Sequence, residues 1–458
     1  MEVLWADIVQ TETLECADGP FTWQCVSLAR ALQIMVTESS GLRDALRAVW
    51  HQQPCTSDAP YHLVIYADEV VPGNVLRLDN KRKVFCVYVT IREVGPSYLK
   101  HESMWVPVAA IRSAKTKEVK GGVSACMRVL FRRWFLSDKL AEQGVVLDLD
   151  IPGSRYATFY FAVGNVVADG DAYRAIWSAK GASGKLPCLL CKNVLSDHVV
   201  SDYLVHFSCP HVERFDAASS SDIWEKVDKL HERVAAVSKK DFENLQMLYG
   251  ITYAPTGLLW DKELRPFVKP VECITFDAMH TLVSNGIVQN ETGLLTAALK
   301  SIGIKWEALR SFVDADWRVC RALGSVSTLR GCFGKPREQA FQSGGVFKSG
   351  ASEMLLLFPV LLHFVHTVVA PSGQLKNETA SYAALGPVLS LVREGKEGAR
   401  VADALAKALR EHAEAFGMAY PDAGFKPKNH YVYHVAQHLR RDPMILDAFV
   451  WGSANTAC

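Results

Sequence analysis

The sequence lacks an excess of charge of either sign. Its 50 Lys and Arg residues nearly balance 49 Asp and Glu residues, which leaves a formal net charge of +1. The bulk basic character that marks many nucleic-acid binders is therefore absent, and any DNA contact must come from a local patch. We also find neither internal repeats nor low-complexity tracts in the sequence. The composition, 49% hydrophobic and 22% charged, is that of a folded globular protein.

An uninterrupted apolar run of membrane length is lacking as well. The longest run, residues 354–370, contains Pro359, His363 and His366, which predicts a buried helix rather than a membrane span. The first 19 residues lack the basic start and apolar core of a signal peptide. We therefore expect an intracellular protein without a membrane partner. In a reducing compartment, paired cysteines among its 12 are metal ligands more readily than disulfides.

The 458 residues are enough for two or three domains. Helical periodicity in residues 1–60 predicts a helical N-terminal segment. Residues 61–204 predict a mixed α/β layer that alternates strands with helices. Residues 205–425 predict a mostly helical insertion, and residues 426–458 a C-terminal segment of the core. The strand candidates of the α/β layer are residues 61–67, 83–92, 104–111 and 156–168.

Carboxylates directly follow the first and the fourth strand candidate. Asp68 and its neighbour Glu69 come after the first, and Asp169 and Asp171 come after the fourth. An acid at a strand end can be a rigidly held metal ligand, although an isolated case is also a common turn former. In a ribonuclease-H-like fold these two strands are neighbours. Their acids would then hold two divalent cations, Mg²⁺ or Mn²⁺, for phosphodiester chemistry.

Cysteine and histidine pairs recur at ligand spacing. Cys188 and Cys191 form a CxxC, which supplies half of a tetrahedral zinc site, a thiol redox pair or two buried thiols. His430, His434 and His438 repeat every four residues and so share one face of a predicted helix. Two histidines at this spacing can bind one metal ion, and a packed or hydrated histidine stripe is the alternative.

The order of these motifs resembles a known family. Four segments carry the resemblance: residues 65–74 (IYADEVVPGN), 167–191 (VADGDAYRAIWSAKGASGKLPCLLC), 276–287 (FDAMHTLVSNGI) and 426–439 (KPKNHYVYHVAQHL). Together they are similar to DDE/D transposases with a helical insertion, of the CACTA and hAT kind. That group is related to the catalytic subunit of the V(D)J recombinase.

The resemblance implies a role for each motif. Asp68 and Asp169 would be the first two catalytic acids, with Glu69 and Asp171 as fallbacks. A structural Zn²⁺ would be bound by the four residues Cys188, Cys191, His430 and His434. Asp277 and His280 would act in DNA handling or catalysis, with a purely structural hydrogen bond as the alternative. The family's partner is DNA, at transposon ends or target sites, which implies a nuclear protein and a homodimer.

The sequence departs from the family at the third catalytic acid. Trp451 and Gly452 stand where a Glu-Arg pair is expected. Asp447 lies one helical turn early, and the family order argues against Glu291 and Glu353. We therefore expect DNA cleavage to be weak or absent. The alternatives are a catalytically inactive, zinc-stabilised DNA- or protein-binding module and an unrelated α/β hydrolase or nuclease.

Overall fold

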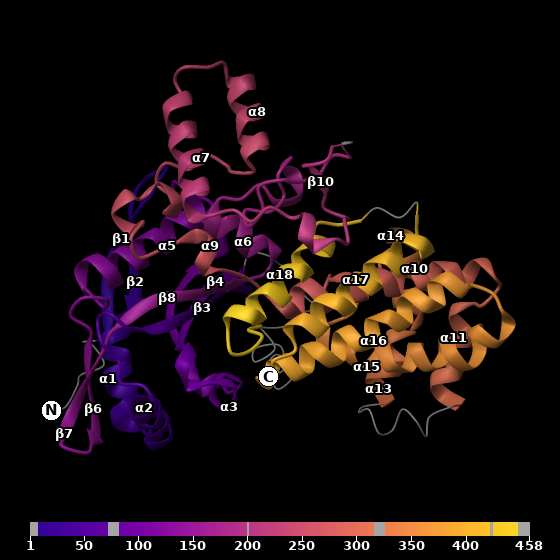
Figure 1. The fold of residues 1–458 in the computed structure, drawn as a ribbon, viewed down its shortest axis with the longest axis horizontal. Coiled ribbons are helices and arrows are strands. Elements are labelled where there is room, and N and C mark those ends of the chain that lie inside the picture. Colours follow the sequence, from indigo (N-terminus) through magenta and orange to yellow (C-terminus); the bar gives the residue numbers. More distant parts are fainter. Residues whose placement is uncertain (1–7, 72–81, 199–200, 316–325, 422–424, 448–458) are drawn as a thin grey trace. The chain divides into compact units, whose positions relative to one another are not determined.

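The protein was analysed as a computed structural model that describes residues 8–71, 82–198, 201–315, 326–421 and 425–447. It divides into two compact units (Figure 1). The first unit comprises residues 1–205 and 215–275, and the second comprises residues 206–214 and 276–458. The fold is thus mixed α/β, with the strands concentrated in the first unit and long helices dominating the second.

The first unit is organised around a seven-stranded mixed sheet. Its strands are β1 (Val9–Cys16), β2 (Gly19–Val26), β3 (Tyr61–Val70), β4 (Val84–Ile91), β5 (Val106–Arg112), β8 (Phe161–Ala168) and β11 (Ile274–Phe276). They lie in the order β1-β2-β5-β4-β3-β8-β11. Strand β3 pairs antiparallel with β4 and parallel with β8, so it is a central strand. Its run from Leu63 to Ala67 is almost entirely buried, as expected for a strand covered on both faces.

The described part of the first unit also contains nine α-helices and two small hairpins, besides short 3-10 and π-helical turns. The helices are α1 (Leu28–Glu38), α2 (Ser40–Gln52), α3 (Pro96–Leu99), α4 (Ser113–Thr116), α5 (Gly122–Arg132), α6 (Gly170–Trp177), α7 (Ser220–Arg233), α8 (Lys239–Tyr249) and α9 (Pro270–Cys273). The extra strands are β6 (Val145–Ile151) with β7 (Ser154–Phe159), and β9 (Val194–Leu195) with β10 (Val205–His206), which ends at the boundary between the units. The hydroxyls of Ser27 and Ser39 cap α1 and α2 by accepting backbone N–H bonds.

The second unit is helical. Its helices are α10 (Ile287–Ser301), α11 (Trp306–Ala315), α13 (Val326–Cys332), α14 (Lys335–Gly344), α15 (Ala351–Phe364), α16 (Lys376–Lys396), α17 (Ala402–Ala419) and α18 (Lys428–Arg441). A π-helical turn, η10 (Met279–Val283), precedes them. The core includes Leu357, Tyr382, Leu385 and Leu405, each with no exposed side-chain surface. Residues 351–372 are long and apolar enough to cross a membrane by length and composition alone, and Leu357 and Val369 within them are buried in the unit.

Several sequence-based expectations need correction. Residues 9–26 are the antiparallel pair β1 and β2 and not helix, because their apolar residues alternate with period two, with Leu14 and Cys16 facing the core. The fourth strand candidate is split into β7 and β8, and β6 was not predicted. Residues 215–275, expected in the helical insertion, belong to the unit that contains the sheet. Residues 426–447, expected in the core, group with the second unit.

Candidate functional site

Asp68 lies near the carboxyl end of β3, and Asp169 directly follows the neighbouring parallel strand β8. Ala67 of β3 is the register partner of Ala168 of β8, and each acid is the next residue along its strand. Neighbouring strands lie about 4.8 Å apart, so the two carboxylates start from adjacent backbone positions. Sequence reasoning predicted this adjacency, and the register bears it out within the first unit.

A bulge in β8 decides which acids share a face. The register shifts by one residue after Leu63, and Gly164 is the extra residue. Without the shift, Glu69 would stand beside Asp169, because a one-residue slip moves every side chain to the opposite face. A Cβ atom on Gly164 would lie 2.7 Å from the Cβ of His62, so the close approach requires glycine. The spacing of the motifs gave no sign of this bulge.

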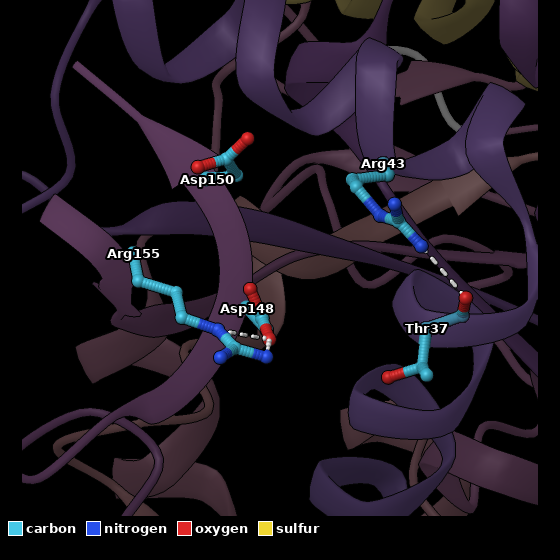
Figure 2. Close-up of a pocket in the computed structure, with 5 residues that line it drawn as sticks. All are labelled: Thr37, Arg43, Asp148, Asp150 and Arg155. Atoms are coloured by element: carbon cyan, nitrogen blue, oxygen red, sulfur yellow. Dashed lines mark hydrogen bonds and ion pairs between the residues drawn. The ribbon is translucent and has the colours of Figure 1, made fainter.

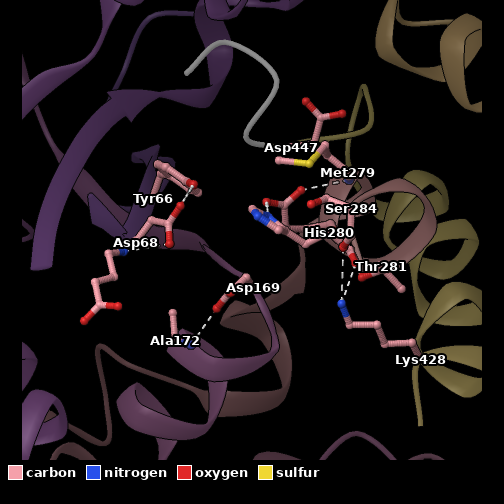
Figure 3. Close-up of polar contacts among 12 residues, drawn as sticks. Tyr66, Asp68, Asp169, Ala172, Met279, His280, Thr281, Ser284, Lys428 and Asp447 are labelled. Atoms are coloured by element: carbon pink, nitrogen blue, oxygen red, sulfur yellow. Dashed lines mark hydrogen bonds and ion pairs between the residues drawn. The ribbon is translucent and has the colours of Figure 1, made fainter. Parts of the chain in front are cut away.

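Local hydrogen bonds hold both carboxylates, as Figure 3 shows. The hydroxyl of Tyr66 donates to Oδ2 of Asp68 at 2.6 Å, and the backbone N–H of Glu69 donates to Oδ1 at 2.6 Å. Asp169 is the N-cap of α6, where its Oδ1 accepts the backbone N–H of Ala172 at 2.6 Å. Both acids are partly exposed. The donors are hard carboxylate oxygens at the surface, a set that fits Mg²⁺ or Mn²⁺.

The two fallback acids are engaged elsewhere. Glu69 is paired with Lys83. Burial acts to raise the pKa of Glu69, but hydrogen bonds from Lys83 and Ser113 prevail and lower it. Asp171 is exposed and bonds to Arg174 one turn along α6 at 2.5 Å. Asp68 and Asp169 are therefore the better-placed pair.

The CxxC lies in a buried loop of the first unit. Cys188 and Cys191 are 1% and 2% exposed. Two main causes raise the pKa of the Cys191 thiol far above its usual range. The larger is the hydrogen bond with Cys188, and the smaller is burial. Two buried thiols in contact share hydrogen bonds in this way until a metal ion displaces their protons.

The HxxxH lies on α18 in the second unit. The Nε2 atoms of His430 and His434 are 3.0 Å apart, and the two residues are 0% and 2% exposed. Nδ1 of His434 lies 2.6 Å from its acceptor, Oε1 of Gln437, and Nε2 is the nitrogen that faces His430. Such a bond to the second nitrogen commonly orients a metal-binding imidazole. Sequence reasoning did not single out Gln437, although it lies three residues after His434.

All four predicted ligands form one buried cluster. The ligand atoms of Cys188, Cys191, His430 and His434 lie within 4.8 Å of one another. Two thiolates and two imidazoles are a common tetrahedral ligand set for Zn²⁺. The cluster can therefore hold a metal ion such as zinc.

Asp277 and His280 form a pair at the start of the helical unit. Asp277 is fully buried, and its Oδ2 accepts the Nδ1–H of His280 at 2.7 Å. Its Oδ1 accepts the backbone N–H of Met279 at 2.9 Å. The Lys428 ammonium donates to the carbonyl oxygen of His280 at 2.7 Å. The imidazole, 19% exposed, is thus held in one orientation and one tautomer.

The acids considered as a third ligand serve structural contacts. Glu291 is fully buried and accepts from Nε2 of His412 at 2.6 Å. Glu353 pairs with Arg337 at 2.7 Å and also caps α15 through the backbone N–H of Gly350. Asp447 pairs with Lys396 at 3.0 Å. Trp451 and Gly452 lie outside the described residues.

Several arginine side chains of the first unit are bound by other groups of the protein. Arg132 of α5 bonds to Asp261 at 2.8 Å and to Glu263 at 2.6 Å. A cavity of about 440 Å³ is lined by Thr37, Arg43, Asp148, Asp150 and Arg155 (Figure 2). Arg43 donates to backbone carbonyls, and Arg155 bonds to Asp148 at 2.7 Å. These guanidinium groups are occupied by the protein itself, which makes them poor candidates for the functional site.

No protein-family model matches the chain, and no curated protein is significantly similar to it in sequence.

Proposed function

We propose that the chain derives from a DDE/D transposase and that its sheet is the catalytic layer of a ribonuclease-H-like fold. The observation that supports the proposal is the bulge-set register of parallel strands β3 and β8, in which Ala67 and Ala168, the residues before Asp68 and Asp169, are partners. A ribonuclease-H-like fold requires this adjacency for its first two acids.

Divalent cations, when bound, would activate a water or a 3′-hydroxyl and stabilise the leaving oxygen of a phosphodiester. Asp68 on β3 and Asp169 after the neighbouring strand β8 would supply the oxygen ligands, and each carboxylate is held by a local hydrogen bond. In the second unit, Asp277 fixes the orientation of the His280 imidazole, which would act in DNA handling. DNA is the proposed partner, the nucleus the proposed location and a homodimer the proposed assembly.

The proposed catalytic site has only two acids, because no residue is assigned as the family's third catalytic acid. Loss of one group that stabilises a transition state typically costs about 10²–10³ in rate. Arg337 and Lys396 form ion pairs with Glu353 and Asp447, and His412 hydrogen-bonds to Glu291, so each of these acids is engaged in a structural contact. We therefore expect the purified chain to bind Mn²⁺ but to cut DNA weakly or not at all.

Manganese binding separates these statements. Electron paramagnetic resonance of free Mn²⁺ gives the affinity of the wild type and of Asp68→Asn and Asp169→Asn. Each substitution should weaken binding by about tenfold or more, because it removes one charged ligand. Asp171→Asn, which removes an exposed acid two residues away, is the matched control and should leave the affinity unchanged. Equal affinities for all four proteins would contradict the proposed site.

Nicking of a duplex with transposon-like ends, in Mg²⁺ or Mn²⁺, tests the expected loss of activity. Efficient cleavage by the wild type that disappears in Asp68→Asn would show that the site is complete and that the missing acid is supplied elsewhere.

A catalytically inactive, zinc-stabilised DNA- or protein-binding module is the second candidate. The cluster of Cys188, Cys191, His430 and His434 favours it. All four ligands of the proposed zinc site are present, whereas the proposed catalytic site lacks one of its three acids. Stoichiometric zinc in a chain that shows no Asp68-dependent Mn²⁺ binding would select this function over the first.

A further inference from the structure

We propose that Tyr66 is a positioning residue that holds the Asp68 carboxylate in its metal-binding orientation. The inference rests on the proposed function, since it concerns the same acid pair. Tyr66 lies in segment 65–74, which carries the family resemblance, but the resemblance assigned it no role; it stands two residues before Asp68 on β3. Residues two apart on a strand project from the same face, so its ring lies beside the acid.

The geometry of the contact is specific. The Tyr66 hydroxyl donates to Oδ2 of Asp68 at 2.6 Å, while the Glu69 N–H donates to Oδ1 at 2.6 Å. One donor on each oxygen fixes the rotation of the carboxylate as well as its position. A carboxylate oxygen that accepts one hydrogen bond can also coordinate a cation, because it has two lone pairs. Figure 3 shows the hydroxyl directed at the acid.

The ring of Tyr66 cannot turn away from this position. It is 3% exposed. On one side it stacks on Tyr88, its register partner on β4, with centroids 6.3 Å apart and planes at 23°. On another side it makes an edge-to-face contact with Trp105, with ring centroids 6.5 Å apart and planes at 78°. Trp105 is in turn fixed by its Nε1–H bond to the Leu99 carbonyl at 2.9 Å.

A rigid donor of this kind acts before any metal arrives. The carboxylate does not have to give up rotational freedom on binding, because Tyr66 and the backbone already restrict it. A phenylalanine would fill the same space between Tyr88 and Trp105, so packing alone does not require the hydroxyl. The alternative is that the hydroxyl only satisfies its own hydrogen bond at the nearest acceptor.

The test is the Mn²⁺ affinity of Tyr66→Phe in the full chain. We expect binding about tenfold weaker than wild type, the usual scale for losing a residue that orients a metal ligand. Tyr61→Phe is the matched control. Tyr61 lies on the same strand, is 2% exposed and donates its hydroxyl to the Gln53 carbonyl at 2.7 Å, away from the acids. Its loss should leave Mn²⁺ affinity unchanged while removing an equally buried hydrogen bond.

A double-mutant cycle identifies the route of the effect. In an Asp68→Asn background the Tyr66→Phe penalty should disappear, and in an Asp169→Asn background it should persist. A penalty of equal size in the Asp68→Asn background would assign Tyr66 a general structural role and overturn the inference. An unchanged affinity in Tyr66→Phe, with Asp68→Asn still weakened, would overturn the inference and leave the proposed function standing. Absence of Asp68-dependent binding in the wild type would overturn both.

Discussion

Removal of one cysteine from the buried metal cluster should release zinc and loosen the chain. Cys188→Ser replaces a thiolate, a strong Zn²⁺ ligand, by a hydroxyl that stays protonated at neutral pH. Cys188 is 1% exposed and its sulfur lies within 4.8 Å of the other three ligand atoms, so it is placed to share one ion with them.

The magnitude follows from the length of chain that the metal closes. Cys191 and His430 are separated by more than 200 residues of sequence. A cross-link that closes a loop of this length lowers the entropy of the unfolded chain by an amount worth about 5 kcal/mol at 25 °C. Because a substituted site can retain part of its metal, this is the upper limit of the expected loss in unfolding free energy.

Two measurements check the prediction. Metal analysis of protein purified without chelator should give about one zinc per wild-type chain and less than about a tenth of that for Cys188→Ser. Urea unfolding should then show a lower midpoint for the variant, and a chelator should bring the wild type to the same midpoint. Cys126→Ser is the matched control, because Cys126 is also 1% exposed but lies on α5 outside the cluster.

Zinc at the wild-type level in Cys188→Ser would refute the assignment of the ligands. A wild-type protein without zinc, even after expression in zinc-supplemented medium, would refute the site itself. Equal losses of stability in Cys188→Ser and Cys126→Ser would show that the cost comes from burying a hydroxyl and not from losing a metal.

Two further predictions concern charges that the fold buries. Burial acts to raise the pKa of Asp261, but hydrogen bonds from two arginines of α5 prevail and lower it. The ionised carboxylate therefore stabilises the folded state fully above pH ~4, and this stabilisation is lost as the pH falls through the pKa of Asp261 in the folded state. Asp261→Asn should therefore cost about 1–2 kcal/mol at pH 7 and much less near pH 2 in urea unfolding. His412→Ala should cost about 3 kcal/mol or more, because it leaves Glu291 buried without its imidazole partner. Lys407→Ala, from an exposed pair on the same helix, should cost under about 0.5 kcal/mol in the same assay.

The sequence indicated the residues of its motifs more clearly than the helices and strands around them. The Asp68 and Asp169 strand ends, the CxxC and the HxxxH were readable because each depends on local spacing. Strands β3, β4 and β8 were found as short apolar runs rich in β-branched and aromatic residues, and α18 was found from the four-residue repeat of its histidines.

The misses have physical causes. The β1 and β2 hairpin was mistaken for helix because the helical period of α1, which follows directly, was extended back across it, although the hairpin's own residues alternate in burial. Helix α16 was not predicted because Gly386 and Pro387 lie in its middle, where both residues usually break a helix. Tertiary packing around Tyr382 and Leu385 overrides that local preference.

The bulge at Gly164 matters most for interpreting the acid pair. Strand-end acids can be recognised from sequence, but which of them share a face depends on a one-residue register shift that no motif records. The same contacts that hold these acids do not require a metal, since Asp169 caps α6 and Asp68 accepts bonds from Tyr66 and the backbone. An acid pair maintained by capping and strand geometry can therefore persist after catalysis is lost. Its presence therefore does not by itself indicate a working metal site, which is distinguished by the Mn²⁺ affinity of the Asp68 and Tyr66 variants.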